Sequence, residues 1–324
     1  MDPSIHRGER PVAEGYRLFA EREAAGVSAV YTDWARQVAA DDQVLALLEE
    51  LPGGKRQPNL VFAAARWHGA QEAYETFRAT VIHQWPAVRE TIMARATQTN
   101  EAGRCATLLP FLAELPQPLA LLEVGAAAGL CLLPDHYSYT YDDGTRLDPP
   151  GGPSPVVIDC ALGTGLPTPA IPQVAWRAGI DLAPVDVTDD EECAWLQTLI
   201  WPGQDHRRER LTAALDIARR ERPQVVAGDL TAALPALAAQ APPEATLVVF
   251  HTAVLAYVAA PGRAAFAELV AGLPGHWISN ESAPVLASTS HLHETGRRFV
   301  LTVDGAPRAL TDPHGRSVAA LSGT

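Results

Sequence analysis

Polar side chains stand where five predicted strands end. They are Glu123, Asp181, Asp229, His251 and the pair Asn280-Glu281. Carboxylates and amides bind the hydroxyl and amine groups of ligands, and histidine exchanges a proton near neutral pH. In a parallel α/β sheet, ligands bind in the crevice outside the carboxyl ends of the strands. The pattern therefore predicts one ligand site assembled from several strand ends.

The first of these strand ends leads into a run of small residues. Residues 119–124 are apolar except for Glu123, which predicts a buried strand. Gly125, three alanines and Gly129 follow, and small residues permit a tight turn that a ligand can approach closely. Because alanine favours helix, we expect a helix to begin inside the motif and to offer free N–H groups at its N-terminus. The motif lacks both G-x-G-x-x-G and the Lys-Ser/Thr pair of a phosphate loop.

Composition limits the class of protein. The chain has 324 residues, of which 47% are hydrophobic, and a formal net charge of −13. This is typical of a soluble globular protein and argues against a broad surface for nucleic acid or anionic membranes. The four cysteines have no CxxC or metal-ligand spacing, so we expect reduced thiols in a cytoplasmic protein without a metal site. We find neither a signal peptide nor an apolar run long enough to cross a bilayer.

Helical and sheet-forming patterns divide the chain. Apolar residues at helical spacing run from residue 12 to about 115, and Pro116 and Pro118 then separate this region from the first strand. We therefore expect an N-terminal helical lid or substrate region at 1–115 and a cofactor-binding domain at 116–324. Alternating tyrosines before an Asp143-Gly144 turn predict an inserted hairpin region at about 135–173.

Strands alternate with helices over the second region. Core strands are expected at residues 119–124, 174–181, 225–229, 247–251 and 276–281, followed by a terminal segment at 299–303 with a turn at Asp304-Gly305. This alternation predicts the α/β class: a Rossmann-like, doubly wound, mostly parallel sheet with an antiparallel C-terminal edge.

The order of these features resembles that of the class I S-adenosylmethionine (SAM) methyltransferases. Their first motif is E/D-x-G-x-G-x-G, and Ala127 replaces its middle glycine here. The resemblance implies that the small-residue loop faces the methionine part of SAM, that Asp181 binds the ribose, and that Asp229 contacts the adenine amine. The cofactor-binding residues that it implies are Glu123, Gly125, Ala127, Gly129, Asp181, Gly228, Asp229, Leu230 and Phe250.

Nearly the whole chain also resembles a bacterial family labelled as a domain of unknown function. The segments that carry this resemblance are RQPNLVFAA, QTNEAGRCA, LEVGAAAGL, WPGQ, VFHTAVLAY and HWISNE. That family is regarded as methyltransferase-like by fold, without an agreed substrate. Together the two resemblances imply a SAM-dependent enzyme that transfers a methyl group to a small molecule.

The ribose-binding acid has two candidates. In nucleotide-binding α/β folds this acid lies about 20 residues beyond the glycines, at the end of the second strand. Asp181 ends a core strand but lies farther away than that. Asp159 is the alternative, although its proline-flanked strand fits the insertion better. We favour Asp181 and keep Asp159 open.

Two amide-rich clusters in the helical region are candidates for the acceptor side. The candidate substrate-binding residues are Gln57, Asn59, Asn100, Arg104 and Tyr137. Arg104 is suited to a carboxylate through a charge-assisted pair. Helix caps and turns are the alternative role for the two clusters, and strand packing is the alternative for Tyr137.

His251 is the candidate general base, because an imidazole titrates near neutral pH. A structural histidine bonded to a neighbouring loop is the alternative. Other functional classes stay open as well: a SAM-using enzyme that does not transfer methyl, such as an intramolecular cyclase, and a non-catalytic SAM- or nucleotide-binding regulator. A dehydrogenase is disfavoured by the missing G-x-G-x-x-G. The sequence leaves the oligomeric state open, a homodimer included.

Overall fold

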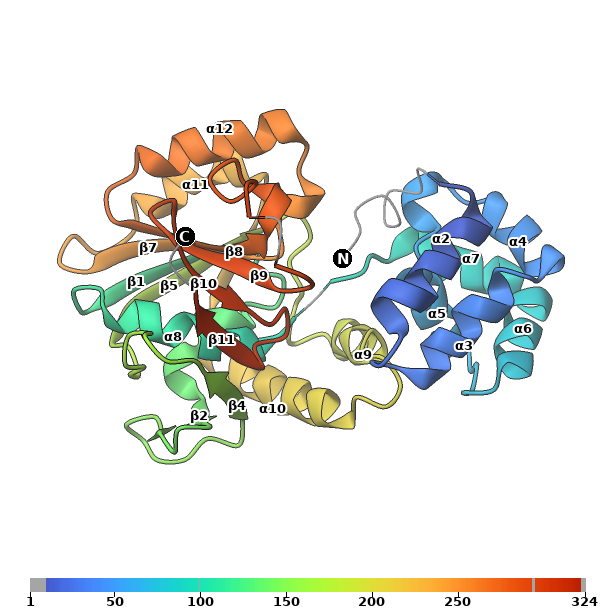
Figure 1. The fold of residues 1–324 in the computed structure, drawn as a ribbon, viewed down its shortest axis with the longest axis horizontal. Helices are drawn as coiled ribbons and strands as arrows, with labels where there is room; N and C mark the ends of the chain where they lie inside the picture. The colour runs from blue at the N-terminus through green and yellow to red at the C-terminus, as the bar shows by residue number, and fades with distance from the viewer. Residues whose placement is uncertain (1–9, 99, 293–294, 322–324) are drawn as a thin grey trace. The chain divides into compact units, whose positions relative to one another are not determined.

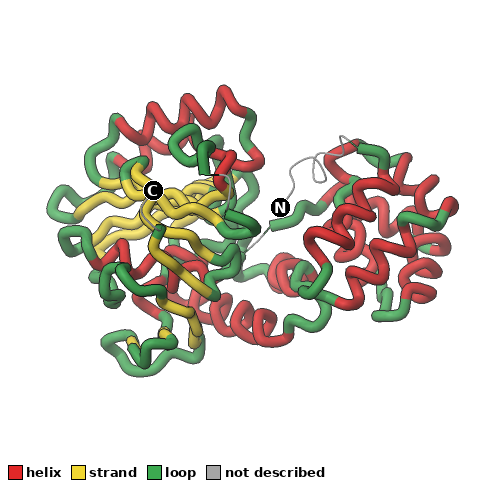
Figure 2. The backbone as a smooth tube through the Cα atoms, viewed as in Figure 1, coloured by secondary structure: helices red, strands yellow, loops and turns green. Residues whose placement is uncertain are grey.

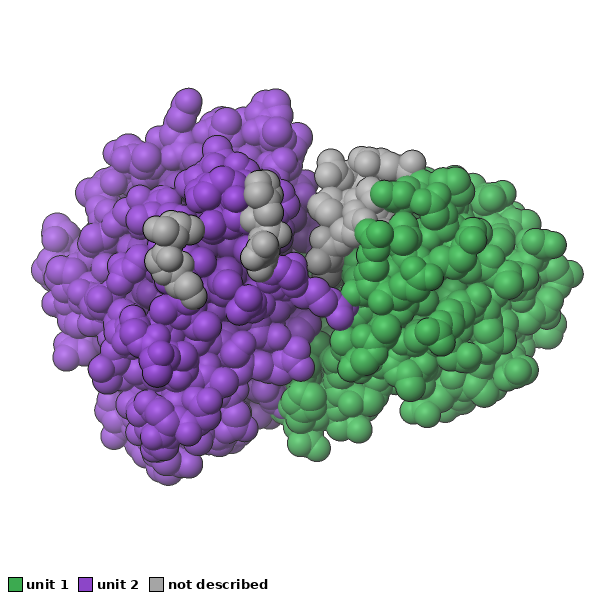
Figure 3. Space-filling model, viewed as in Figure 1, with its two compact units in different colours: residues 1–99, 190–209 green, residues 100–189, 210–324 purple. Residues whose placement is uncertain are grey.

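The chain divides into two compact units. Figure 1 shows it as a computed structural model, which describes residues 10–98, 100–292 and 295–321. Unit 1 comprises residues 1–99 and 190–209, and unit 2 comprises residues 100–189 and 210–324, as coloured in Figure 3. The chain therefore passes between the units three times, and residues 190–209 belong with the N-terminal helices.

Unit 1 is helical, and local capping explains where several of its helices begin. The Ser28 hydroxyl accepts a hydrogen bond from the N–H of Tyr31 at 3.3 Å, and the Asp41 carboxylate accepts one from Gln43 at 3.1 Å. Its helices are α2 (Val12–Phe19), α3 (Ala29–Val38), α4 (Asp42–Glu49), α5 (Pro58–Trp67), α6 (Tyr74–His83), α7 (Trp85–Ala94) and α9 (Asp190–Thr198); α10 (Asp205–Glu221) begins here and continues into unit 2.

An aromatic cluster forms the core of unit 1. The Phe62 ring on α5 is fully buried and lies edge-on to the rings of Tyr16, Trp34 and Phe77 at 5.4–5.7 Å between centroids. Such edge-to-face pairs add to the stabilisation from burial. Trp195 of α9 is part of the same core, which explains why this later segment joins the N-terminal helices.

The helix α8 (Cys105–Ala113) belongs to unit 2, although we expected the helical region to extend to residue 115. Its backbone accepts a hydrogen bond from Tyr141 of the inserted hairpin at the carbonyl of Ala106, 2.8 Å away. The Arg308 guanidinium also lies over the Phe111 ring at 5.5 Å. These contacts tie α8 to the sheet, so the observed division falls at residue 99 rather than at the two prolines.

Unit 2 contains one large, mostly parallel sheet with helices packed against it, which makes the fold mixed α/β. Its strands are β1 (Leu119–Val124), β2 (Ser138–Tyr141), β3 (Arg146–Leu147), β4 (Val157–Leu162), β5 (Val174–Asp181), β6 (Gln224–Ala227), β7 (Thr246–Thr252), β8 (His276–Ser282), β9 (Phe299–Val303), β10 (Ala306–Thr311) and β11 (Ser317–Ala320). Their order in the sheet is β3-β2-β4-β11-β10-β9-β8-β7-β1-β5-β6.

The strand order reverses at β1. After β1 the chain first builds the insertion strands β2 to β4 at the far edge of the sheet. It then adds β5 and β6 on one side of β1, and later β7 and β8 on the other side, and these five strands are all parallel. Beyond β8, the strands β9 and β10 run antiparallel, as expected for the C-terminal segment. The sheet does not end there, because β11 joins it to the three strands of the insertion.

Helices cover both faces of the sheet (Figures 1 and 2). On one face, α11 (Leu230–Ala238) and α12 (Ala260–Ala271) pack on the inward side chains of β1, β5 and β7, with Leu122, Val249 and Phe266 at most 1% exposed. The opposite face carries α8 and the part of α10 that begins at Arg210. Alternate residues of each central strand thus point to different layers.

The expected helix after the small-residue loop is wrong. The loop leads into two three-residue turns, η4 (Leu130–Leu132) and η5 (Pro134–His136), instead of an α-helix. Gly129 is left-handed at φ 69°, and only four residues separate it from Pro134, which lacks an N–H. A stable helix cannot form in so short a stretch.

The first prediction concerns the aromatic core of unit 1. Phe62→Ala should lower the free energy of unfolding of unit 1 by about 3–5 kcal/mol, because it leaves a large cavity. Urea unfolding followed by tryptophan fluorescence measures this, since five of the seven tryptophans belong to unit 1: Trp34, Trp67, Trp85, Trp195 and Trp201. Met93→Ala, at a side chain 39% exposed, is the control. Equal losses in both variants contradict the prediction.

Candidate functional site

The loop after β1 is fastened to the end of β5. Gly125 and Ala126 donate their N–H groups to the carbonyl of Ile180 at 2.7 and 3.1 Å. The N–H of Ala127 donates to the Asp181 carboxylate at 2.8 Å. The carboxylate of Asp181 also accepts a bond from the N–H of Ala183 at 2.9 Å. Asp181 therefore fixes the loop and the end of its own strand together.

The remaining N–H groups of the loop also have acceptors within the chain. Ala128 donates to the amide oxygen of Asn100 at 2.8 Å, and Gly129 donates to the carbonyl of Ala126 at 2.7 Å. The expectation of free N–H groups at a helix N-terminus is therefore wrong for this loop. A ligand at this position has to bind through the side chains around the loop, or replace one of them.

Packing accounts for the glycine that opens the loop. Gly125 has φ 74°, and a β-carbon there would lie 2.4 Å from the Val254 side chain. Ala127 also has a positive φ of 48°, which is uncommon for alanine. Any larger residue at position 125 would therefore disturb the packing against Val254. A loss of function in such a variant could not be assigned to a lost ligand contact.

The sheet order separates the two candidate ribose-binding acids. Asp181 ends β5, directly beside β1, and its carboxylate touches the loop. Asp159 lies exposed on β4, on the far side of β9 and β10 from β1. Only Asp181 thus lies beside the small-residue loop, and each of its carboxylate oxygens keeps a lone pair for a further donor.

Glu123 lies buried in the middle of this arrangement. It pairs in register with Gly179 of β5 and with Phe250 of β7, and it is 4% exposed. Burial, with a smaller effect from the nearby Cys131, raises the pKa of the Glu123 carboxyl well above its usual range. Its Oε2 atom is fully buried and has no hydrogen-bond partner among the residues that the structure describes. The site therefore holds a buried carboxyl with a raised pKa and an unused oxygen.

Gly228, Asp229 and Leu230 follow the next strand end. Gly228 donates its N–H to the carbonyl of Asp181 at 2.9 Å, which places this segment beside the end of β5. Asp229 is exposed and caps α11, because its Oδ1 accepts from the N–H groups of Thr231 and Ala232 at 2.8 and 3.2 Å. Hydrogen bonds from Thr231 and Ala232 lower the pKa of the Asp229 carboxyl. Leu182, also at this edge, exposes 79% of its surface.

His251 is enclosed by the protein. Its Nδ1 lies 2.8 Å from the Glu281 carboxylate, and its Nε2 accepts a hydrogen bond from the indole N–H of Trp277 at 3.1 Å. The side chain is fully buried, and so is the neighbouring Phe250 apart from 2% of its surface. Because Nε2 is the acceptor, Nδ1 carries the proton of a neutral ring. Both nitrogens are engaged, so this geometry fits the structural alternative and offers no free base.

The candidate acceptor residues fall into different parts of the molecule. Gln57 and Asn59 lie in unit 1, where Gln57 accepts from Thr97 at 3.1 Å and donates to the carbonyl of Gly54 at 3.1 Å, as a turn residue does. Asn100 and Arg104 lie in unit 2 and contact the candidate site. The proposed lid over the sheet therefore stays a prediction.

Tyr137 and the two tyrosines that alternate with it serve the packing of the insertion. Each is at most 1% exposed, and each donates its hydroxyl to a backbone carbonyl, that of Leu130 in the case of Tyr137 at 2.8 Å. Within the insertion, β2 and β3 pair antiparallel across the Asp143-Gly144 turn. Tyr137 thus supports the segment that follows the loop, which fits the packing alternative, and its role beside an acceptor stays a prediction.

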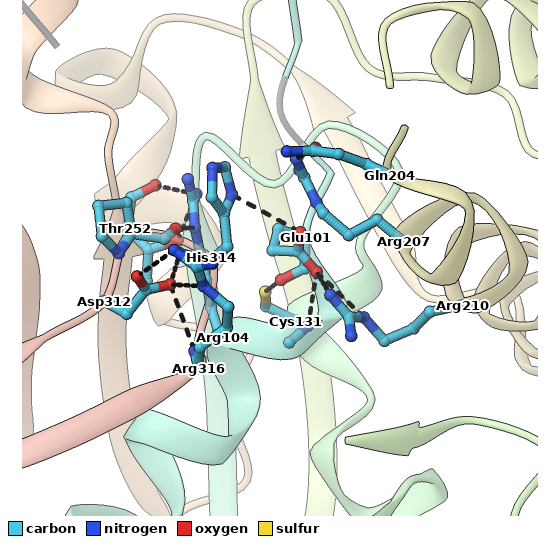
Figure 4. A network of polar contacts seen from close by, with 12 residues as sticks. Glu101, Arg104, Cys131, Gln204, Arg207, Arg210, Thr252, Asp312, His314 and Arg316 are labelled. Atoms are coloured by element: carbon cyan, nitrogen blue, oxygen red, sulfur yellow. Dashed lines mark hydrogen bonds and ion pairs between the residues drawn. The ribbon is translucent and has the colours of Figure 1, made fainter. Parts of the chain in front are cut away.

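A turn near the C-terminus completes the site, and the sequence analysis missed it. Residues 312–316 connect β10 to β11 and pack on the short helix η3 (Ala102–Arg104), as Figure 4 shows. Gly315 has φ 84°, and a β-carbon there would lie 1.9 Å from the carbonyl oxygen of Gly103. This close backbone contact therefore requires glycine at both positions. An Asp-Pro-His-Gly-Arg turn between strands carries no signal of this partner, which lies 212 residues earlier in the chain (315 − 103).

Charged pairs hold this turn and η3 in place. Glu101, 4% exposed, accepts hydrogen bonds from the N–H of Gly103 at 3.1 Å and from Arg210 of α10 at 2.8 Å. Asp312 binds Arg316 at 2.9 Å within the turn. Burial raises the pKa of Asp312, but hydrogen bonds from Arg316 and the N–H of His314 outweigh it, and the pKa is lowered overall.

Comparison with known proteins identifies the family. Residues 13–319 match the family described as "Uncharacterized protein conserved in bacteria (DUF2332)". Because the match spans nearly the whole chain, the protein belongs to this family, and the expected resemblance to a bacterial family of unknown function is confirmed. No functionally curated protein and no solved structure matches the chain.

The described residues include neither a candidate membrane span nor a candidate metal cluster. No helix there is both long and apolar enough to cross a membrane. Within the same residues, no group of three or more His, Cys, Asp or Glu side chains is arranged to hold a metal ion.

The second prediction concerns the buried carboxyl of Glu123. Because its pKa is raised in the folded state, the folded protein keeps a proton that the unfolded chain loses above about pH 4.3. Stability is therefore full below that pH and declines as pH rises toward the folded pKa. Glu123→Gln removes this decline, so its melting temperature should exceed that of the wild type increasingly from pH 4 to pH 8.

Glu268→Gln, on the exposed side of α12, controls for the loss of one negative charge. Thermal unfolding of the three proteins over this pH range is the measurement. A Glu123→Gln variant that loses stability relative to the wild type as pH rises contradicts the burial of an uncharged carboxyl.

The third prediction concerns His251. His251→Leu should destabilise the protein by about 1–3 kcal/mol, because it leaves the partly buried Trp277 indole without its acceptor and removes one of the hydrogen bonds to the buried Glu281 carboxylate, which keeps those from the N–H groups of Val254 and Leu255. His276→Leu is the matched control, because His276 is only partly buried and bonds to Asp304. Denaturant unfolding compares them. If His251→Leu costs no more than His276→Leu, the enclosed histidine is not a structural element.

Proposed function

We propose that this protein is a SAM-dependent methyltransferase that acts on a small molecule, with SAM bound at the carboxyl edge of β1, β5 and β6. The observation that carries the proposal is the reversal of strand order at β1. In doubly wound α/β sheets, ligands bind at such a reversal, outside the carboxyl ends of the strands. We infer that the parallel strands β6-β5-β1-β7-β8 form a Rossmann-like core.

The side chains at this edge suit the nucleoside part of the cofactor. Asp181 keeps lone pairs on both carboxylate oxygens, which suits the two hydroxyls of a ribose. The exposed Leu182 offers an apolar surface to a purine ring, and Asp229 lies at the next strand end as an acceptor for an exocyclic amine. These features support an adenosyl ligand lying across β5 and β6.

The charged part of SAM suits Glu123. A buried carboxyl whose pKa is raised by burial binds a cation favourably, because the cation compensates the charge that burial disfavours. Both the amine and the sulfonium of SAM are cations. The unused Oε2 of Glu123 is a further reason to expect a donor or cation at this point.

Chemistry at this site would depend on alignment. When bound, SAM supplies a methyl group already activated by its sulfonium, so orientation of the acceptor provides much of the rate. The chain's own residues would bind the cofactor and exclude water from the edge of the sheet. His251 takes no part as a base in this proposal, because both of its ring nitrogens are engaged.

A non-catalytic SAM- or nucleotide-binding regulator is the second candidate, and the enclosure of His251 favours it. Product analysis after incubation with labelled SAM and metabolite extracts separates the possibilities. Labelled methyl in a new compound supports the methyltransferase, whereas methylthioadenosine as the product indicates an intramolecular cyclase. Binding without turnover supports the regulator.

We also propose a cytoplasmic location, since all four cysteines are free and buried thiols. Oxidising compartments outside the cytoplasm favour disulfide bonds over free thiols. Fractionation of cells that express a tagged copy tests this proposal.

The fourth prediction concerns cofactor binding. Calorimetry should detect binding of SAM and its demethylated product S-adenosylhomocysteine, but not of NAD. Asp181→Ala should weaken this binding by about 1–3 kcal/mol, the scale of a lost hydrogen bond to a charged group. Asp159→Ala, on the exposed side of β4, should bind normally.

Because Asp181 also fastens the loop, hydrogen exchange of residues 125–129 is measured on each variant without ligand. Asp181→Ala with protected loop amides and full affinity for S-adenosylhomocysteine contradicts the ribose assignment. A wild-type protein that binds neither SAM nor its product contradicts the proposed function as a whole.

A further inference from the structure

Arg104 is a buried cation without a carboxylate partner. Its side chain is 5% exposed; its Nε donates to the carbonyl of Pro313 at 2.9 Å, and its Nη1 donates to the carbonyl and hydroxyl of Thr252 at 2.9 and 3.1 Å (Figure 4). All these acceptors are neutral. Among residues 10–98, 100–292 and 295–321, no carboxylate lies within ion-pair distance of the guanidinium. A buried charge is costly unless an opposite charge compensates it.

The neighbouring carboxyl groups are committed elsewhere. Glu101 forms its ion pair with Arg210 at 2.8 Å, and Asp312 forms its own with Arg316 at 2.9 Å. Burial raises the pKa of the Glu123 carboxyl although the charge of Arg104 lowers it, and no ion pair joins Glu123 to Arg104 among the described residues. None of these neighbouring acids thus forms an ion pair that compensates the charge of Arg104.

A second unpaired donor lies beside the same threonine. Asn280 of β8 is the register partner of Thr252 of β7, and register partners on adjacent strands point to the same face of a sheet. Asn280 is fully buried, and its Oδ1 accepts a hydrogen bond from the Thr311 hydroxyl at 2.7 Å. Its Nδ2 is fully buried and finds no acceptor in the part of the chain that the structure describes. Arg104 and Asn280 therefore both lie beside Thr252, and each can donate a further hydrogen bond.

We propose that Arg104 and Asn280 form a carboxylate-binding subsite at the carboxyl ends of β7 and β8. A carboxylate supplies one negative charge and two acceptor oxygens, which matches one guanidinium and one amide. A phosphate dianion would bring more charge than the single unpaired cation compensates. The subsite lies on the opposite side of β1 from Asp181, so one ligand or two adjacent ligands can occupy both positions.

The carboxylate has two possible sources, and naming them rests on the proposed function. One source is the amino-acid end of SAM, and the other is the methyl acceptor. The subsite itself does not depend on that function, because it follows from the unpaired donors alone. An experiment can therefore test the subsite and the cofactor separately.

The experiment compares ligands that differ only in the carboxylate. S-adenosylhomocysteine is paired with methylthioadenosine, which keeps the nucleoside and thioether but lacks the amino-acid end. Benzoate is paired with the neutral benzamide, with and without saturating methylthioadenosine. Calorimetry measures affinity in the wild type and in Arg104→Gln, Arg104→Lys and Asn280→Asp. Arg308→Gln removes a half-exposed cation that is paired with Glu114, and it serves as the control.

Two results support the subsite. If SAM is the source, Arg104→Gln and Asn280→Asp lower the affinity for S-adenosylhomocysteine about 10- to 100-fold and leave that for methylthioadenosine unchanged. If the acceptor is the source, both adenosyl ligands bind normally, but the preference for benzoate over benzamide disappears. In either case Arg104→Lys retains part of the effect, and Arg308→Gln behaves as the wild type does.

Other results overturn the proposal. A wild-type protein that shows no carboxylate preference in either pair has no such subsite. The same conclusion follows if a folded Arg104→Gln keeps the wild-type preference. Should Arg104→Gln fail to fold, Asn280→Asp decides, because the added negative charge repels a carboxylate at that position. If the protein prefers benzoate to benzamide but binds neither adenosyl ligand, the subsite is supported and SAM is rejected as the cofactor.

Discussion

The Asp181 carboxylate fastens the loop after β1 to the end of β5. It ends β5 and accepts the N–H of Ala127 in the loop after β1, so it joins the two strands at the edge where the strand order reverses. Without this acceptor, the N–H of Ala127, a left-handed residue in the middle of the loop, would lose its only hydrogen-bond partner among the described residues. Asn100 accepts a hydrogen bond from Ala128 in this loop, and Gly228 donates one to the carbonyl of Asp181, so both adjoin the residues that the carboxylate fixes.

A second constraint acts on the other side of β1. The segment Glu101–Arg104 lies near the start of unit 2 and is buried there, where Glu101 binds Arg210 and the two glycines 103 and 315 touch. This arrangement brings a C-terminal turn and an N-terminal segment together over the ends of β7 and β8. It also leaves Arg104 buried among neutral acceptors, which is an unusual state for a guanidinium and the basis for expecting an anion there.

Local signals in the sequence account for much of the fold. The expected strand at residues 174–181 coincides with β5, and the Asp143-Gly144 turn marks the hairpin, because apolar runs and turn residues act over a few positions. The helix after the small-residue loop failed because Ala127 is left-handed and Pro134 follows closely. Alanine content alone could not reveal either restraint. The membership of α9 in unit 1 depended on Trp195 packing with residues more than 100 positions earlier.

The candidate site was foreseen at its strand ends but not in its contacts. Asp181 was preferred over Asp159 from the sequence, and the sheet order gives the geometric reason. By contrast, the partners of His251 are Trp277 and Glu281 from another strand, and no periodic pattern indicates that they enclose both ring nitrogens. The turn at residues 312–316 was missed for the same reason, since its importance comes from a contact with Gly103.

The central claim is that an adenosyl ligand binds where the strand order reverses at β1. A crystal structure of the protein with S-adenosylhomocysteine tests it most directly. The account predicts ribose hydroxyls at the Asp181 carboxylate, with the amino-acid end directed past the small-residue loop toward Glu123. Density for the ligand at any other place, or a fully occupied ligand without contact to Asp181, contradicts the account.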